Sequence, residues 1–427
     1  MTNIQDHTLR YALANELHAR PFPSLSAPCF AAYLAIKQPT DAARRDRERD
    51  RAHLIALLDR FGAQHPRADA THWFGQIGRF RLKWESHTEF VTYTVFGDGV
   101  AGRAFDRDSF SVFPAAWLAE APGVRITSAL IRVEAREPDD AGIDDKLGAW
   151  FVPESLAVSE VLEGAALVAS DFRIDPAGHM RMAVFTDPAI GQRRTGRIVQ
   201  RLAEIETYKT MSMLGLARVR DLSEKMSALD RDLSRLMDAM TSEGARPEET
   251  LQGLLRVWAE LETVQAQSSF RFGATEAYEA LVTQRIGALR ESRYRGRQTF
   301  GEFMMRRFDP AMRTVKATRR RLREMSDRAL RAGDLLRTRV DVARSAQNQE
   351  LLGSLDRRAD LQLRLQRTVE GLSVVAISYY AVSLAAYALE PLMTLAGISQ
   401  TVGTALLVPA VVALVWVMVR RVRRRLD

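Results

Sequence analysis

Cysteine is nearly absent from this chain, since Cys29 is the only one among 427 residues. A single thiol excludes a disulfide framework and any metal site that needs several cysteines of one chain. Histidine is sparse as well, with seven residues that show no metal-ligand spacing. Disorder of the whole chain is also excluded, because 46% of the residues are hydrophobic and 27% are charged, a composition that can bury a sizeable core.

Motifs that carry known chemistry are missing. The chain has no glycine-rich phosphate loop, no Gly-x-Ser-x-Gly turn and no His-Glu-x-x-His pair. Residues 313–344 hold eleven Lys and Arg against four acids, yet no aromatic residues alternate with them as they do in many nucleic-acid sites. We therefore expect no enzymatic activity, no organic cofactor and no nucleic-acid partner. Anionic lipid head groups or an acidic protein domain fit the basic stretch better.

Charge is almost missing from residues 372–419, where Glu390 is the only acid or base apart from tyrosine. Two uncharged runs lie inside this stretch, residues 372–389 and 401–419, and each would be about 27 Å long as a helix. A bilayer core is about 30 Å thick, so the sequence predicts two transmembrane helices. Pro391 should end the first helix, which leaves residues 390–400 as a short outer loop.

The charged flanks of these runs predict their orientation. Four arginines lie shortly before the first run, five lie in the tail formed by residues 420–427, and the loop has none. The positive-inside rule places both termini in the cytoplasm. Because the N-terminus lacks the pattern of a signal peptide, we expect a protein of the bacterial inner membrane, with membrane lipid as a partner and most of the chain in the cytoplasm.

The cytoplasmic part changes its pattern and its charge at residue 187. Residues 1–187 carry 21 basic and 26 acidic residues, whereas residues 188–371 carry 35 and 25. The first part mixes a helix with strands, and the second has helical periodicity with breaks at 247, 270–273 and 309–310. The predicted fold is an α+β cytoplasmic domain, a long α-helical stalk and a C-terminal two-helix transmembrane hairpin. The predicted helix covers 40–61, the predicted strands cover 78–84, 89–96, 124–133, 165–173 and 180–185, and the helical part runs from 193–240 to a last helix that starts near 311.

An acidic loop is the first candidate site. Residues 134–145 carry six carboxylates, which are ligands of the kind that Mg²⁺ or Ca²⁺ prefers. Their spacing matches no EF-hand, and acidic loops are commonly only solvated, so cation binding and plain solvation both stay open. The residues concerned are Glu134, Glu137, Asp139, Asp140, Asp144 and Asp145.

The first transmembrane helix carries the second candidate site. Most of its polar side chains recur at spacings of three and four residues and therefore share one face. Polar residues within a bilayer normally face a protein interior or a water-filled path, and in a homo-oligomer they would form rings that end in a ring of carboxylates. Simple contact between packed helices is the alternative. We call this face the polar seam, and it consists of Ser373, Tyr380, Ser383, Tyr387 and Glu390.

Three segments resemble the signature segments of an uncharacterised bacterial family of membrane-anchored proteins. They are 11–22 (YALANELHARPF), 79–96 (RFRLKWESHTEFVTYTVF) and 196–215 (GRIVQRLAEIETYKTMSMLG). The run WESHTEF at 84–90 is fairly specific. This resemblance implies a membrane anchor and brings no assigned activity.

The architecture is also similar to that of the CorA-type magnesium channels, which are homopentamers. An α/β domain, a stalk helix, a C-terminal two-span hairpin and a basic tail (RRVRRR, residues 420–425) carry this resemblance. It implies a pentamer, a pore lined by the first span, and a divalent cation such as magnesium. The family's Gly-Met-Asn motif is replaced here by YALEPLM at 387–393.

Two functions follow from these patterns. The first is a homo-oligomeric, CorA-like cation channel or transporter whose pore is lined by the polar seam. The alternative is a membrane-anchored cytoplasmic sensor or scaffold without transport activity, in which the hairpin serves only as an anchor.

Overall fold

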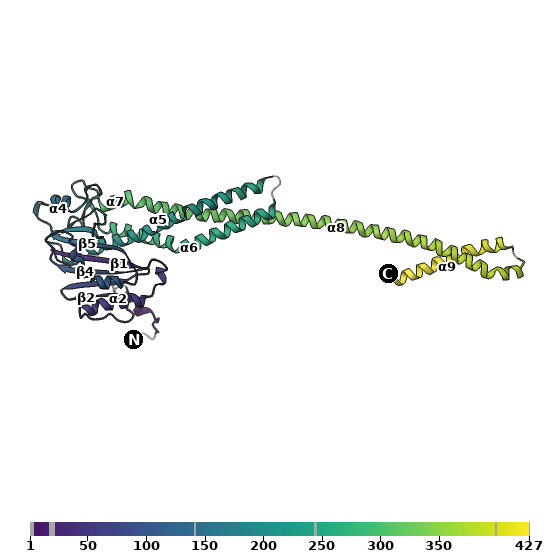
Figure 1. Cartoon of the computed structure of the whole chain (residues 1–427), viewed down its shortest axis with the longest axis horizontal. Helices are drawn as coiled ribbons and strands as arrows, with labels where there is room; N and C mark the ends of the chain where they lie inside the picture. Colours follow the sequence, from purple (N-terminus) through teal and green to yellow (C-terminus); the bar gives the residue numbers. More distant parts are fainter. Residues whose placement is uncertain (1–3, 17–21, 141, 243–245, 398, 427) are drawn as a thin grey trace. The chain divides into compact units, whose positions relative to one another are not determined.

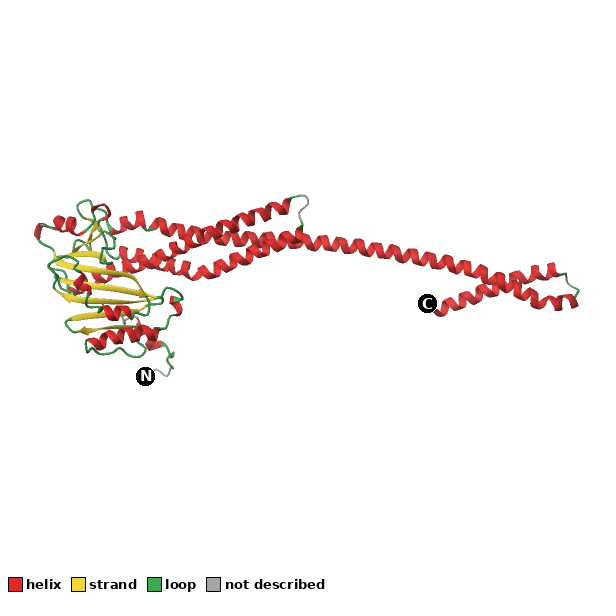
Figure 2. Cartoon of the chain, in the orientation of Figure 1, coloured by secondary structure: helices red, strands yellow, loops and turns green. Residues whose placement is uncertain are grey.

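The computed structural model describes residues 4–16, 22–140, 142–242, 246–397 and 399–426. The chain divides into two compact units. The sheet unit comprises residues 1–243 and 252–332, and the hairpin unit comprises residues 244–251 and 333–427. The described strands all belong to the sheet unit, and the hairpin unit is helical (Figure 2).

A nine-stranded sheet organises the sheet unit (Figure 1). Its strands lie in the order β2-β3-β4-β1-β5-β8-β7-β6-β9. Neighbouring strands are antiparallel, except that β5 and β8 are parallel. The strands are β1 (Cys29–Lys37), β2 (His72–Ile77), β3 (Phe80–Ser86), β4 (Phe90–Asp98), β5 (Val124–Ala135), β6 (Ala157–Val161), β7 (Ala166–Ser170), β8 (Met180–Thr186) and β9 (Ser292–Arg293).

Helices cover both faces of this sheet. Along β1, Cys29 and Tyr33 face the core that the sheet shares with α5, whereas Leu34 and Ile36 face the core shared with α2 and α3. Since a strand alternates its side chains, a strand that is buried on both faces must be apolar throughout. The helices are α1 (Arg10–Glu16), α2 (Arg47–Arg60), α3 (Ala115–Ala119), α4 (Ile143–Trp150), α5 (Gln192–Thr241), α6 (Pro247–Gly287), α7 (Phe300–Arg307), α8 (Asp309–Leu395) and α9 (Gln400–Leu426).

The predicted strands are confirmed with small shifts of their ends. The patterns at 78–84 and 89–96 form the antiparallel pair β3 and β4, and those at 124–133, 165–173 and 180–185 correspond to β5, β7 and β8. The sequence analysis missed β1, β2, β6 and β9. The run CFAAYLAIK of β1 has no apolar and polar alternation because both of its faces are buried.

The helical part follows the sequence patterns with three corrections. α2 begins at Arg47 behind an Asp46 cap and not near residue 40, because Asp41 adopts a left-handed conformation with φ 48° and starts a separate 3₁₀ turn. α6 begins at Pro247 as expected but runs through 270–273 without a break. α8 begins at Asp309, slightly before the expected start near 311, and continues to Leu395.

The sheet and the helices that follow it share one core. Side chains of β1, β5, β8, α5, α7 and the start of α8 belong to the same hydrophobic cluster. In Figure 1, α5, α6 and the first part of α8 lie side by side. Residue 187 therefore marks a change of secondary structure, as the sequence predicts, but it is not the edge of a packed unit.

The first apolar helix ends later than the sequence analysis placed it. α8 continues through Pro391 to Leu395, so the connection to α9 comprises residues 396–399 and not 390–400. Pro391 has no N–H to donate within the helix, yet helical hydrogen bonding continues beyond it. The Thr394 hydroxyl donates to the Glu390 carbonyl over 2.7 Å, and the Ala396 N–H donates to the Leu392 carbonyl over 3.1 Å.

Candidate functional site

In the hairpin unit, α9 packs against a face of α8 that is distinct from the polar seam. Gly403 of α9 approaches Met393 of α8 so closely that an added Cβ would lie 2.2 Å from the Met393 sulfur. Among the described residues between 372 and 419, the side chains with the lowest exposure are Ser378 on α8, 6% exposed, and Val415 on α9, 4% exposed. By length and apolar composition, both helices could cross a membrane, as the sequence predicts.

Apart from a contact between Gln400 and Glu390, α9 leaves the polar seam uncovered. Tyr380 is 67% exposed and Tyr387 is 75% exposed. Ser373 and Glu390 are exposed as well, and Ser383 is half-buried. The structure therefore keeps these five residues together along one side of α8 and leaves that side open.

The polar groups of the seam are held by local hydrogen bonds. The Ser373 and Ser383 hydroxyls donate to carbonyls four residues earlier in the helix, over 2.8 and 3.0 Å. At the end of α8, the Gln400 amide of α9 donates to the Glu390 carboxylate over 3.3 Å. The carboxylate is thus oriented by the neighbouring helix while it remains accessible.

Carboxylates of the acidic loop form ion pairs with neighbouring basic side chains. Glu134 lies 2.6 Å from Arg132 and 2.8 Å from Lys146, and Asp140 lies 2.5 Å from Arg136. Burial raises the pKa of Glu134, but hydrogen bonds from Lys146 and Arg132 outweigh it and lower that pKa.

The other acids of the loop do not join these two in one cluster, although Glu137 shares the partner Lys146 with Glu134. Asp144 pairs with Arg295 and Arg297, Glu137 lies 3.5 Å from Lys146, and Asp145 is exposed. The side chain of Asp139 lies outside the described residues. Across the described ranges, no three His, Cys, Asp or Glu residues lie together so that they could hold a metal ion.

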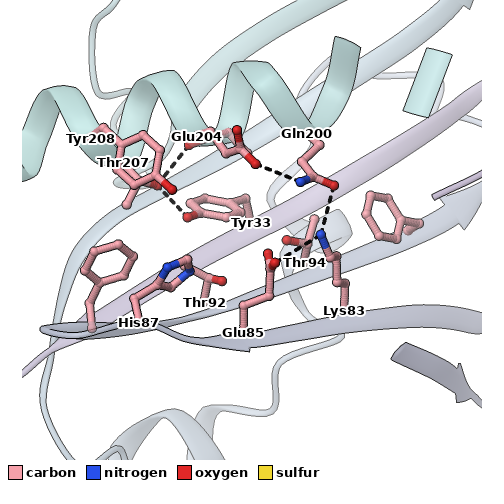
Figure 3. A pocket seen from close by; sticks show the side chains of 13 residues that line it. Tyr33, Lys83, Glu85, His87, Thr92, Thr94, Gln200, Glu204, Thr207 and Tyr208 are labelled. Atoms are coloured by element: carbon pink, nitrogen blue, oxygen red, sulfur yellow. Dashed lines mark hydrogen bonds and ion pairs between the residues drawn. The ribbon is translucent and has the colours of Figure 1, made fainter. Parts of the chain in front are cut away.

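A buried polar layer that the sequence analysis missed lies between the sheet and α5 (Figure 3). The Tyr33 hydroxyl of β1 lies 2.5 Å from the Thr207 hydroxyl of α5. Lys83 of β3 donates to the Gln200 side chain over 2.8 Å and lies 3.2 Å from Glu85. Burial raises the pKa of Tyr33 well above its ordinary value, so this hydroxyl stays protonated.

The space inside this layer is small. Its cavity measures about 20 Å³, which is room for one water molecule. The layer therefore provides a fixed set of hydrogen bonds between sheet and helix and has no room for a substrate. A tyrosine inside the apolar run of β1, Tyr33, is the only sequence signal that could have indicated it.

The WESHTEF run occupies the turn between β3 and β4 and ties that turn to two helices. The buried Arg45 guanidinium, just before α2, donates to the carbonyls of His87 and Phe90. Glu89, only 1% exposed, accepts hydrogen bonds from Arg271 and Tyr278 of α6. These contacts explain the polar residues of the segment by their role in the packing of the turn.

The basic stretch at 313–344 is partly neutralised inside the sheet unit. Arg321 and Arg328 of α8 contact Asp230 of α5 over 2.6 and 2.8 Å. Lys316 and Arg319, also on α8, pair with Glu279 and Glu276 of α6. Four of these cations therefore hold the helices together.

Fold and site together define a protein that combines an N-terminal sheet domain, long helices and a C-terminal pair of apolar helices. Residues 5–426 match the model of a family described as "Protein of unknown function (DUF3422)". Since the match covers nearly the whole chain, the protein belongs to this family. No curated protein matches the chain.

Proposed function

We propose that this chain is a subunit of a homo-oligomeric membrane protein that passes cations along the polar seam of α8. The observation that carries the proposal is the position of α9. It packs on another face of α8 and leaves Tyr380, Tyr387 and Glu390 open. Polar groups on a membrane helix need a polar surrounding, and copies of the same seam around an axis supply one.

The chemistry of the seam suits a cation. Hydroxyl oxygens and tyrosine rings offer weak, repeated contacts to a partly hydrated positive ion, so it can enter and leave. A ring of Glu390 carboxylates at the end of the path would raise the local concentration of cations. The single acid in the whole apolar segment lies on this seam.

Architecture supports the same function. The helix that carries the seam is the helix that starts in the core of the sheet unit, because α8 runs unbroken from Asp309 to Leu395. Displacement of its first turns would reach the seam and open or close it. The resemblance to CorA-type channels favours a pentamer in the inner membrane with both termini in the cytoplasm. The missing Gly-Met-Asn motif means that magnesium selectivity is not part of the proposal.

Flux into liposomes tests the proposal. Purified full-length protein is reconstituted, and uptake of monovalent and divalent cations is compared with empty liposomes. Tyr387→Phe and Glu390→Gln should reduce the flux because both alter the seam. Ser378→Ala is the control, since Ser378 is a polar residue of the same helix that is only 6% exposed and lies away from the polar seam, and its flux should equal that of the unaltered chain.

Absence of flux for every cation would refute the channel and favour an anchored sensor or scaffold. Two further measurements separate these functions. The mass of the detergent-solubilised particle should correspond to a closed ring of about five subunits for the channel, and a monomer or dimer favours the anchor. Replacement of the hairpin by an unrelated one should abolish the cellular phenotype of a channel and preserve that of a scaffold.

A further inference from the structure

An open cleft of about 660 Å³ lies at the start of β1, beside the end of α2. Phe30 of β1 and Phe80 of β3 form two of its walls, with ring centroids 6.2 Å apart and ring planes at 76°. Phe61, which follows α2, adds a third aromatic ring. All three rings are half-buried and keep a surface toward the cleft.

Strand pairing and two glycines bring the rings of Phe30 and Phe80 together. Phe30 pairs with Gly97 on β4, the strand between β1 and β3. An added Cβ at Gly97 would lie 2.2 Å from the Phe30 ring, so only glycine lets the ring lean across β4 toward Phe80. The turn that carries Arg79 depends on Gly78, whose φ of +55° is a glycine conformation.

A positively charged side chain, that of Arg79, already lies in the cleft. The Arg79 guanidinium carbon lies 4.9 Å from the centroid of the Phe80 ring, which is the geometry of a cation–π contact. Asp98 and Asp108 also line the cleft, and the Asp98 side chain is 86% exposed, 3.7 Å from Arg81. The cleft is thus lined by three aromatic rings, two carboxylates and one exposed arginine, Arg79, which contacts the Phe80 ring.

We propose that this cleft binds a small organic cation of the alkylammonium or guanidinium class, and that Arg79 occupies the position of that ligand when the cleft is free. Rings at right angles stabilise a diffuse positive charge better than a neutral group of the same shape. The carboxylates add long-range attraction. The volume lies within the range of small-molecule sites. The proposal is independent of cation flux through the hairpin unit.

Calorimetric titration of the full-length protein in detergent tests the proposal. The probes are choline and 3,3-dimethylbutan-1-ol, which has the same shape as choline but no charge. Choline should bind about two- to fivefold more tightly than the neutral alcohol, the factor that a cation–π contact at a solvent-accessible site supplies. Equal binding of both probes, or no binding of choline, would overturn the proposal.

Two variants test the roles of the residues. Arg79→Ala should tighten choline binding severalfold, because the competing guanidinium is gone. Since Arg79 is exposed, this variant keeps the fold. Phe80→Leu should abolish the preference for choline, whereas Phe74→Leu, on an aromatic residue that is 40% exposed and outside the cleft, should keep it. Weaker binding in Arg79→Ala, or binding of inorganic phosphate in place of choline, would show an anion site and refute the proposal.

Discussion

The substitution Glu89→Gln tests the buried contact between the WESHTEF turn and α6. The Glu89 carboxylate is 1% exposed and accepts hydrogen bonds from Arg271, whose side chain is 17% exposed, and from Tyr278. Lys37, 7% exposed, is a second buried cation beside them. Burial and the Arg271 charge lower the pKa of Lys37, and Glu89 opposes this effect. Without the carboxylate, the buried Lys37 and the partly buried Arg271 lose the negative charge that balances their repulsion.

The expected loss in the free energy of unfolding is about 3–5 kcal/mol, the cost of removing one partner of a buried ion pair. Each kcal/mol lowers the midpoint of thermal unfolding by about 2–4 °C in a domain of this size class. Unfolding is followed by near-ultraviolet circular dichroism on full-length protein in detergent, which reports the aromatic core of the sheet unit.

The exposed pair of Arg290 and Glu163 is the matched control for this experiment. Its side chains are 65% and 67% exposed, and exposed pairs contribute at most about 1 kcal/mol. Glu163→Gln should therefore change the midpoint by only a few degrees. If both variants lose the same small amount, the buried pair does not hold the turn to α6 and the reasoning is refuted.

Three other changes test separate parts of the sheet unit. Gly196→Ala should prevent stable folding, measured as loss of soluble protein, because the new Cβ would lie 1.6 Å from the Pro23 carbonyl oxygen, a backbone atom. Burial lowers the pKa of His53 below its usual 6.5, so the unfolded chain takes up this proton first. Stability should then be complete above about pH 6.5 and fall as the pH drops toward the folded pKa, with a shallower fall in His53→Gln. Asp230→Asn removes the partner of Arg321 and Arg328 and should cost less than about 1 kcal/mol because the cluster is partly exposed, a difference that 1 M NaCl should erase.

Sequence patterns predicted those elements that alternate or repeat visibly. β3 alternates apolar with charged residues, β4 is rich in aromatic and β-branched residues, and α5 keeps an apolar stripe along its 50 residues, so these elements were predicted. β1 could not be distinguished in the same way, since CFAAYLAIK fits a buried helix as well as a strand that is covered on both sides.

Predictions from single residues were wrong where neighbouring residues determined the local structure. Pro391 carries a rule for helix ends, but α8 continues beyond it, and the Ala396 N–H still donates to the Leu392 carbonyl. For the candidate sites, spacing alone grouped the polar seam correctly on one side of a helix. The cleft is lined by Phe30 and Phe80, which lie on two strands separated by 42 residues. No local sequence pattern predicts a contact between residues so far apart in the chain.

The burial of Cys29 has a practical consequence for the study of this protein. Its thiol is 0% exposed at the start of the central strand β1, and burial raises its pKa to about 12. A thiol that is neither accessible nor ionised does not react with maleimides or spin labels. The native chain is therefore not labelled by these reagents. A cysteine placed anywhere along α8 would be the sole attachment point, and distances between identical positions of an assembly could be measured by electron paramagnetic resonance without first altering β1.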